Sequence, residues 1–472
     1  MRAMKIKVAS IAVLGTVLFL FSAIAAFAAP ATMRLDYYHT GDVTHEVFSV
    51  DRIVIEPVPW PGDMTKTIDS TNLGNYCFEV HEESSGKLLY SRGFNSVYGE
   101  WVTTEEAKHA DRTFSESLRF PAPSAPVKIV LKKREGEQFK DVWTTRVDPK
   151  DKFIDTSLPP SPGPLLVIQN NGEPATKADL LILGDGYTAA ERAKFEQDAR
   201  KFAEILFKVS PFREHRQDFN VWALCPAAPE SGVSRPSSGI HVRSPLGASY
   251  DTFGTERYVL TVENRALRDV ASYAPYEFIE ILLNSSTYGG GGIFNLYATV
   301  AADSEWAPYV FVHEFGHHFA GLADEYYTSD VAYLPPEKRT EPWEPNVTAL
   351  LDPNDLKWKD LVAPGTPLPT PWAKVQFDAM EKQIQEQRRT MRAENRPEAE
   401  MNALFKDERK REEEMLASDK FSTKVGAFEG ANYESQGYYR PQENCIMFTR
   451  YSSFCEVCRK AIEHIVGMYA SH

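Results

Sequence analysis

The sequence has no excess of positive charge and, beyond its first residues, no long hydrophobic run. It carries 52 Lys and Arg residues against 66 Asp and Glu residues, which gives a formal net charge of −14 at pH 7. This charge argues against general nucleic-acid binding and against attachment to anionic membrane surfaces, because both require a basic surface. No stretch after residue 28 is long and apolar enough to span a bilayer, and no internal repeat or clear calcium-binding loop is evident. What remains is a globular chain of 472 residues, which is enough for two or three domains.

Cysteine is scarce, and three of the five cysteines lie within fourteen residues: Cys445, Cys455 and Cys458. An odd number leaves at least one thiol unpaired in a monomer. Three interpretations of this cluster are open. The one we favour for an exported protein is a disulfide from Cys445 to Cys455 or Cys458. The others are a redox Cys-x-x-Cys pair, which lacks a thioredoxin-like setting, and a structural zinc site completed by His464 with loose spacing.

The N-terminal residues have the pattern of a signal peptide. A short basic segment precedes an apolar run from residue 8 to residue 25, and Ala26-Phe27-Ala28 forms a small-x-small cleavage site. We therefore predict that residues 1–28 direct export to the periplasm or to the extracellular space. No stable membrane association is expected after cleavage, since no cysteine follows the apolar run to carry a lipid anchor. An uncleaved membrane anchor is the alternative.

Residues 29–157 predict an all-β sandwich domain. Short apolar or alternating segments are separated by Gly, Pro, Asn and Asp turns, as in residues 47–50, 53–55, 76–80 and 127–131. The segment contains no metal-spaced cluster and no nucleophile motif, so we interpret it as a binding or supporting module. The Pro-rich residues 158–164 predict a stiff linker at the domain boundary.

Residues 165–472 alternate between strand and helix patterns, which is typical of an α/β or α+β domain. Apolar segments predict strands at residues 178–184, 219–224, 277–283 and 293–300. Thr188 and Glu191 form a capping-box pattern that begins a helix ending near residue 207, and further helices are expected at residues 264–272 and 454–468. Residues 371–420 are rich in charge and carry a thin apolar stripe broken at Pro397. They predict an inserted helical hairpin, which we interpret as a solvated arm in preference to a lid or a docking arm.

The clearest chemical signal is His313-Glu314-Phe315-Gly316-His317. Two histidines four residues apart lie on the same side of a helix, so both imidazoles can reach one Zn²⁺ ion. Glu314 lies beside the open coordination position, where a base is needed. Catalytic zinc usually has three protein ligands, and after a turn of the chain Asp324 or Glu325 can supply the third. The adjacent His318 points about 100° away around the helix and is not expected to bind the ion.

The order of the predicted elements is similar to that of the metzincin zinc peptidases. In that class an edge strand above the zinc holds the substrate extended, and a methionine turn lies beneath the metal. The resemblance implies that residues 289–300 supply the edge strand and that Met447 forms the turn. The spacing departs from the standard pattern His-Glu-x-x-His-x-x-Gly-x-x-His/Asp, which would place the third ligand at Ala323. The aspartate comes one residue later, so Asp324 is our first choice as the third ligand and Glu325 our second.

A closer resemblance joins three features of the chain. They are His-Glu-Phe-Gly-His-x-Phe-Ala-Gly-Leu-Ala-Asp-Glu-Tyr at residues 313–326, the preceding β domain, and Asn-Cys-Ile-Met followed by Phe-Cys-x-Val-Cys within residues 444–458. Together they resemble the IgA peptidase family of bacterial secreted metallopeptidases, over nearly the whole chain after residue 28. That family's pattern, His-Glu-x-x-His-x-x-x-Gly-x-x-Asp-Glu, fits without a gap. The resemblance implies zinc endopeptidase activity, but it does not imply that immunoglobulin A is the substrate.

These observations predict an exported zinc metalloendopeptidase that acts on protein or peptide substrates, with host proteins among the candidates. His313, His317 and Asp324 would hold Zn²⁺, and Glu314 would be the general base. Three residues near the methionine turn are candidates for an oxyanion or substrate contact: Tyr439, Arg440 and Tyr451. Two alternatives are open. One is a non-catalytic exported binding protein with a vestigial metal site, and the other is a zinc hydrolase that acts on a cell-wall or glycoprotein target.

Overall fold

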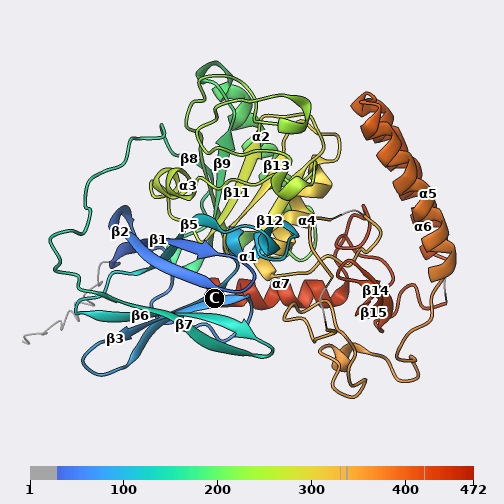
Figure 1. Ribbon diagram of the computed structural model, residues 1–472, viewed down its shortest axis with the longest axis horizontal. Helices are drawn as coiled ribbons and strands as arrows, with labels where there is room; N and C mark the ends of the chain where they lie inside the picture. The colour runs from blue at the N-terminus through green and yellow to red at the C-terminus, as the bar shows by residue number, and fades with distance from the viewer. Residues whose placement is uncertain (1–28, 330, 336–337, 419, 472) are drawn as a thin grey trace, which may run out of the picture.

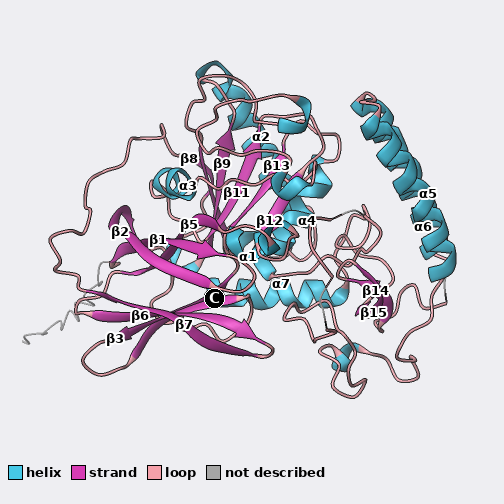
Figure 2. Cartoon of the chain, in the orientation of Figure 1, coloured by secondary structure: helices cyan, strands magenta, loops and turns pink. Residues whose placement is uncertain are grey.

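The computed structural model describes residues 29–471, except residues 330, 336–337 and 419. The predicted signal peptide, residues 1–28, lies outside the described residues. Within the described part of the chain, no helix combines the length and the hydrophobicity that crossing a membrane requires. Most strands gather in two regions, the N-terminal sheets and a larger sheet further along the chain, and most helices follow the N-terminal sheets in the chain (Figure 2).

The N-terminal region consists of two antiparallel sheets with strand orders β2-β1-β5 and β4-β3-β6-β7 (Figure 1). Along β5, residues that face the core alternate with more exposed ones, as expected for a sheet with one buried face. The two sheets share one core, to which Leu35 and Phe120 contribute from one sheet and Phe78 and Leu131 from the other. This confirms the expected N-terminal domain of antiparallel sheets. Its strands are β1 (Ala31–Gly41), β2 (Glu46–Pro59), β3 (Tyr76–Glu82), β4 (Leu88–Phe94), β5 (Arg112–Pro121), β6 (Val127–Glu135) and β7 (Gln138–Val147).

A short helix, α1 (Val97–Trp101), connects β4 to β5 and packs into the second domain. The Ser96 side chain caps it by accepting a hydrogen bond from the backbone N–H of Gly99. Tyr98 and Trp101 are fully buried in a core that also contains Tyr297 of the second domain. The N-terminal region is therefore joined to the second domain by a packed core as well as by the linker.

The second domain is built on a six-stranded mixed sheet of order β12-β13-β11-β9-β10-β8. The four central strands are parallel, and the two edge strands are antiparallel to their neighbours. Successive side chains of β9 enter the cores on opposite faces of the sheet, which is why this strand reads as one continuous apolar run. The strands are β8 (Leu166–Gln169), β9 (Ala178–Asp185), β10 (Phe219–Leu224), β11 (Phe278–Leu283), β12 (Gly290–Ile293) and β13 (Tyr297–Ala301).

Helices cover both faces of this sheet. Helices α2 (Arg192–Leu206) and α4 (Ala307–Ala320) pack on one face, and α3 (Asn264–Ala271) packs on the other. The expected capping box is present, because the Glu191 carboxylate accepts from the backbone N–H of Thr188 and the Thr188 side chain accepts from the backbone of Glu191. The arrangement confirms an α/β domain with a mixed sheet.

The prediction of one strand at residues 293–300 is wrong. The chain forms a hairpin there, with β12 and β13 joined through Asn295, whose φ is +53°. The glycines at residues 290–292, which precede the predicted strand, lie in β12. Neither β8 nor the hairpin of β14 (Phe428–Ala431) and β15 (Glu434–Arg440) was predicted. β8 and β14 have only four residues each, and β15 is mostly polar.

The C-terminal part of the chain adds three helices. α5 (Lys374–Ala393) and α6 (Glu398–Leu416) pack on each other at one edge of the molecule, with Pro397 at the break, and α7 (Glu456–Tyr469) crosses beneath the sheet towards the N-terminal region (Figure 1). The apolar stripe of α5, which includes Phe377 and Ile384, is buried in the main core. The helical pair is thus docked along one face, whereas we had interpreted it as a solvated arm.

Candidate metal centre

Helix α4 places His313 and His317 side by side. Their four-residue separation is about one helical turn, and the two Nε2 atoms lie 3.2 Å apart. Phe311, Phe315 and Phe319 pack another side of the helix into the core beneath the sheet. The helix ends at Gly321, whose φ of +59° is the left-handed conformation typical of a helix C-terminus. This ending turns the chain back towards the two imidazoles.

The returning segment brings Asp324 to the same point. Its Oδ1 atom lies 3.0 Å from His313 Nε2 and 3.2 Å from His317 Nε2. The other ring nitrogens are also engaged: His313 Nδ1 donates to the Ile446 carbonyl at 2.9 Å, and His317 Nδ1 donates to the Leu322 carbonyl at 2.5 Å. These contacts keep the proton on Nδ1, so both Nε2 atoms present a lone pair towards Asp324.

The three atoms fit a zinc ion. Tetrahedral zinc with ligand distances of about 2.0–2.1 Å separates neighbouring ligand atoms by about 3.3 Å. The observed edges of the triangle are 3.0, 3.2 and 3.2 Å. Two imidazole nitrogens and one carboxylate oxygen are a common donor set for zinc that keeps a position open. Asp324 Oδ1 is buried and accepts no hydrogen bond from the protein, which leaves it available to an ion.

The electrostatics of the three residues are strongly coupled. Burial would raise the pKa of Asp324, but the neighbouring imidazoles of His317 and His313 outweigh it and hold that pKa well below 3.8. Burial opposes protonation of His317, but the Asp324 carboxylate outweighs it and raises the pKa of His317 to about 9. A positive charge is therefore favoured at this point, whether it is a proton or a metal ion.

Glu314 lies next to this group and lines a cleft of about 670 Å³ together with His317 and Asp324. Burial raises the pKa of its carboxyl group. Strand β12 packs against α4 and lines the same cleft through Gly290 and Gly292, where close packing requires glycine. A Cβ atom on Gly292 would lie 2.3 Å from the Glu314 carbonyl oxygen, and one on Gly290 would lie 2.6 Å from a Val310 methyl carbon.

The N-terminal region supplies another wall of the cleft, which the sequence did not predict. Asn95, Glu100 and Thr103 line it. Burial raises the pKa of Glu100 to about 7, and hydrogen bonding to Tyr333 opposes that shift. The backbone N–H of Leu334 donates to the Thr103 carbonyl at 2.9 Å, so the N-terminal region also holds the segment that covers this side of the cleft.

Sequence reasoning also missed three residues beside the triangle. Tyr433 donates its hydroxyl proton to Asp324 Oδ2, and Arg257 donates to the Tyr326 hydroxyl at 3.2 Å. All three line the cleft. Asn432 and Tyr433 form the two-residue turn between β14 and β15, both with positive φ. A tyrosine with a φ of +64° is unusual and marks a position held by its surroundings, but no motif in the sequence identifies it.

The remaining candidates lie elsewhere. Arg440 is buried over the rings of Trp372 and Phe448 and donates to backbone carbonyls. Tyr439 pairs through its backbone with residue 348. Neither of these residues, nor Tyr451, is among the described residues that line the cleft.

Met447 packs against Gly316 of α4, and His318 lies on the side of α4 that faces the sheet. Met447 is fully buried, and a Cβ atom on Gly316 would lie 3.2 Å from its sulfur. His318 points away from Asp324 into the sheet, where its Nε2 accepts from the Ile279 backbone N–H and its Nδ1 donates to the Ile293 carbonyl, both at 3.0 Å.

Glu325, the second choice for the third ligand, points away from the cleft. Its buried side chain lies against Cys445, Cys455 and Cys458. All five cysteines are free, so the disulfide that we favoured is not formed. His464 lies outside this group. The alternative zinc site of three cysteines and His464 is therefore not formed.

Two models of known protein families match consecutive parts of the chain. Residues 166–466 match the IgA peptidase M64 family, and residues 24–144 match the N-terminal region described as Peptidase M64 N-terminus. The family match indicates a peptidase. The chain belongs to the IgA peptidase M64 family, as the resemblance in the sequence predicted. No curated protein matches the chain.

Proposed function

We propose that the protein is an exported zinc metalloendopeptidase, with His313, His317 and Asp324 as the ligands and Glu314 as the general base. The observation that carries this proposal is the triangle of ligand atoms, with edges of 3.0–3.2 Å, at the wall of a cleft that Glu314 also lines. Export rests on the signal-peptide pattern of residues 1–28.

The chemistry follows from the side chains around the cleft. When bound, a zinc ion supplies Lewis-acid chemistry and lowers the pKa of a water molecule to about 7. The Glu314 carboxylate takes a proton from the attacking water and delivers it to the leaving amine. Its raised pKa makes the carboxylate a stronger base towards the water, and a pKa shifted towards the operating pH suits a group that must first take up a proton and then give it back.

We assign the oxyanion contact to Tyr326 and Arg257, in place of Tyr439, Arg440 and Tyr451. Tyr326 and Arg257 line the cleft and are joined by a hydrogen bond of 3.2 Å. The Tyr326 ring also stacks near that of His313, with centroids 6.4 Å apart. A donor held in this way is oriented before the substrate carbonyl acquires negative charge.

The substrate lies in an extended form along β12, in the manner of a metzincin edge strand. β12 is the edge of the six-stranded sheet, and Gly290 and Gly292 line the cleft. The Cβ positions of both glycines are filled by α4 and β13, and the main chain of Gly290 pairs with residues 257 and 259, so a substrate backbone would meet the strand at the main chain of Gly292. The N-terminal residues Asn95 and Glu100 face the same cleft and would contact one side of the bound chain.

The test is digestion of a panel of folded and unfolded proteins, including immunoglobulins, followed by mass spectrometry of the products. Glu314→Ala should lower the cleavage rate by about 10²–10⁴-fold. Glu305→Ala is the matched control, because Glu305 is an exposed glutamate just before α4 that pairs with Lys406. Equal cleavage by wild type and Glu314→Ala would contradict the assignment.

The same panel separates the alternatives. Binding of a panel protein without cleavage would support a binding protein with a vestigial site. Hydrolysis restricted to cell-wall peptides or glycoproteins would support the other zinc hydrolase.

A further inference from the structure

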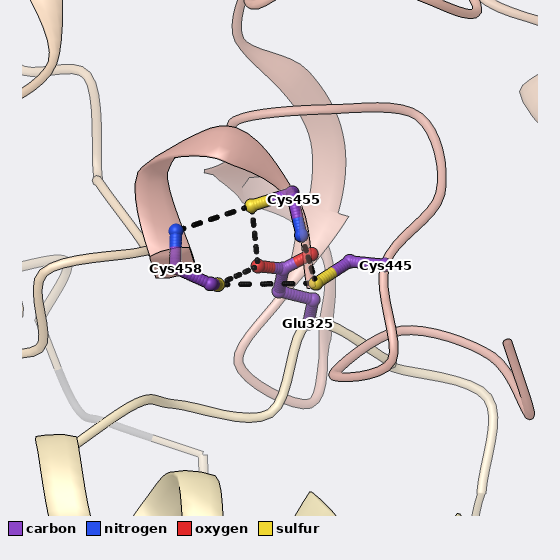
Figure 3. A group of neighbouring side chains, drawn as sticks. All are labelled: Glu325, Cys445, Cys455 and Cys458. Atoms are coloured by element: carbon purple, nitrogen blue, oxygen red, sulfur yellow. Dashed lines mark hydrogen bonds between the residues drawn. The ribbon is translucent and has the colours of Figure 1, made fainter. Parts of the chain in front are cut away.

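A second cluster of ligand-type side chains lies behind the first, sealed from solvent. It consists of Glu325, Cys445, Cys455 and Cys458 (Figure 3). Glu325, Cys445 and Cys458 have no exposed surface, and Cys455 has 4%. Three separate parts of the chain meet here: the segment after α4, the loop after β15 and the first turn of α7.

The distances within the cluster match a tetrahedral zinc site. Zinc with bonds of about 2.3 Å to sulfur and 2.0–2.2 Å to oxygen separates neighbouring ligands by about 3.5–3.8 Å. Cys445 Sγ and Cys458 Sγ are 3.8 Å apart, and Glu325 Oε1 lies 3.3 Å from Cys458 Sγ and 3.9 Å from Cys455 Sγ. All four ligand atoms lie within 4.8 Å of one another.

Hydrogen bonds within the protein do not satisfy all the polar atoms of the cluster. Glu325 Oε2 is buried and has no hydrogen-bond partner. Glu325 Oε1 accepts from the Asn346 amide at 2.9 Å, and its other contacts are to thiols, which are weak donors. A carboxylate in this position is costly unless a positive charge accompanies it. The nearby buried Arg440 donates its hydrogen bonds to backbone carbonyls.

The surrounding backbone favours thiolates. Cys455 is the N-cap of α7, and its sulfur accepts from the Cys458 backbone N–H at 3.4 Å. The sulfur of Cys445 accepts from the Cys455 backbone N–H at 3.2 Å. A helix N-terminus stabilises a thiolate, and hydrogen bonds to sulfur are common around metal-bound cysteines.

We propose that Glu325, Cys445, Cys455 and Cys458 bind a second zinc ion whose role is structural. The site takes four protein ligands and leaves no open position, which is the arrangement of structural zinc. The proposal rests on these four residues and their packing, and it does not depend on the proposed peptidase activity.

The second ion would hold the floor of the first site. Glu325 follows Asp324 directly, and its backbone N–H donates to the Met447 carbonyl at 2.8 Å. Cys445 is followed by Ile446, whose carbonyl accepts from His313 Nδ1. One ion at the cluster therefore fixes both the segment that carries Asp324 and the loop that orients His313.

The experiment measures zinc bound to the full chain, purified without reductant and supplied with zinc alone, together with X-ray absorption at the zinc edge. Wild type should hold two zinc ions per chain, with sulfur among the neighbours of the metal. Cys458→Ser should hold one ion and lose most of the sulfur signal. Cys225→Ser is the matched control, because this half-buried cysteine lies outside the cluster, and it should still hold two ions.

The outcomes for the two sites can be told apart. Wild-type protein without sulfur neighbours around zinc would overturn the proposal, even if Cys458→Ser failed to fold. A disulfide between Cys445 and either Cys455 or Cys458, detected by mass spectrometry of alkylated peptides, would also overturn it. A single ion with sulfur neighbours would support the second site and contradict the first.

Discussion

Asp324 and Glu325 are neighbours in the chain, yet they belong to two sites of opposite character. Asp324 joins two histidines at the wall of a cleft, whereas Glu325 joins three cysteines in the interior. The first group offers three ligand atoms and an open side, and the second offers four and is closed. Solvent access, more than the type of acidic residue, therefore separates the group that we propose as catalytic from the group that we propose as structural. Because Asp324 and Glu325 are joined by a peptide bond, a substitution in one group should also weaken the other group to some extent.

The largest effects are expected when the carboxylate charge of Asp324 or of Glu325 is removed. Asp324→Asn should abolish most activity, by more than about 100-fold, because it removes a ligand and not only an outer hydrogen bond. Glu325→Gln should mainly lower stability, by about 3 kcal/mol or more, because a buried ligand is lost. Cleavage rates at low temperature and thermal unfolding of both variants would test this pair. The reverse result, an inactive but stable Glu325→Gln, would contradict the division of roles.

Metal removal should act on the two sites in order. The cleft exposes the first site to a chelator, whereas side chains cover the second. Activity should therefore disappear with release of the first zinc ion, before the thermal midpoint falls with release of the second. Time courses of zinc release, activity and unfolding in the presence of a chelator would show these stages. Simultaneous loss of both ions would mean that the two sites open together.

A hydrogen bond to the proposed ligand Asp324 can be removed without changing any ligand. Tyr433→Phe removes the hydroxyl that donates to Asp324 Oδ2. Loss of such an outer contact typically costs about 10–100-fold in metal affinity or activity, so this range is expected here. Tyr439→Phe is the control, because Tyr439 lies on the same hairpin but outside the cleft. Zinc titration of both variants would measure the difference in affinity. Equal affinities would show that the Tyr433 hydroxyl does not contribute to the site.

The smallest expected effect concerns the wall supplied by the N-terminal region. The pKa of Glu100 is raised from 4.5 to about 7 by burial. Between these two pH values the folded protein binds more protons than the unfolded chain, so its stability falls as the pH rises. Glu100→Gln should flatten this part of the stability profile. Urea unfolding at several pH values would measure it, and an unchanged slope in the variant would contradict the assignment.

Much of the fold could be predicted because its signals are local. Strands β9, β10 and β11 are mostly apolar segments, and the capping box of Thr188 and Glu191 begins its helix as expected. The hairpin of β12 and β13 was misjudged. A strand of glycines has no side-chain pattern, and its form depends on packing against Glu314 and His317 of α4.

The sequence by itself determined the pairing of His313 and His317, because helical periodicity brings residues four apart together whatever surrounds them. It also limited the third ligand to two neighbouring acidic residues. Only the tertiary structure places Asp324, and not Glu325, beside the two imidazoles, since the direction of each side chain depends on partners more than a hundred positions away, Tyr433 for Asp324 and Cys458 for Glu325. The same holds for the three clustered cysteines. The sequence pattern favours a disulfide among them, because it does not show that Glu325 lies beside them. Contacts between such distant segments arise from packing of the whole chain, and local pattern does not encode them.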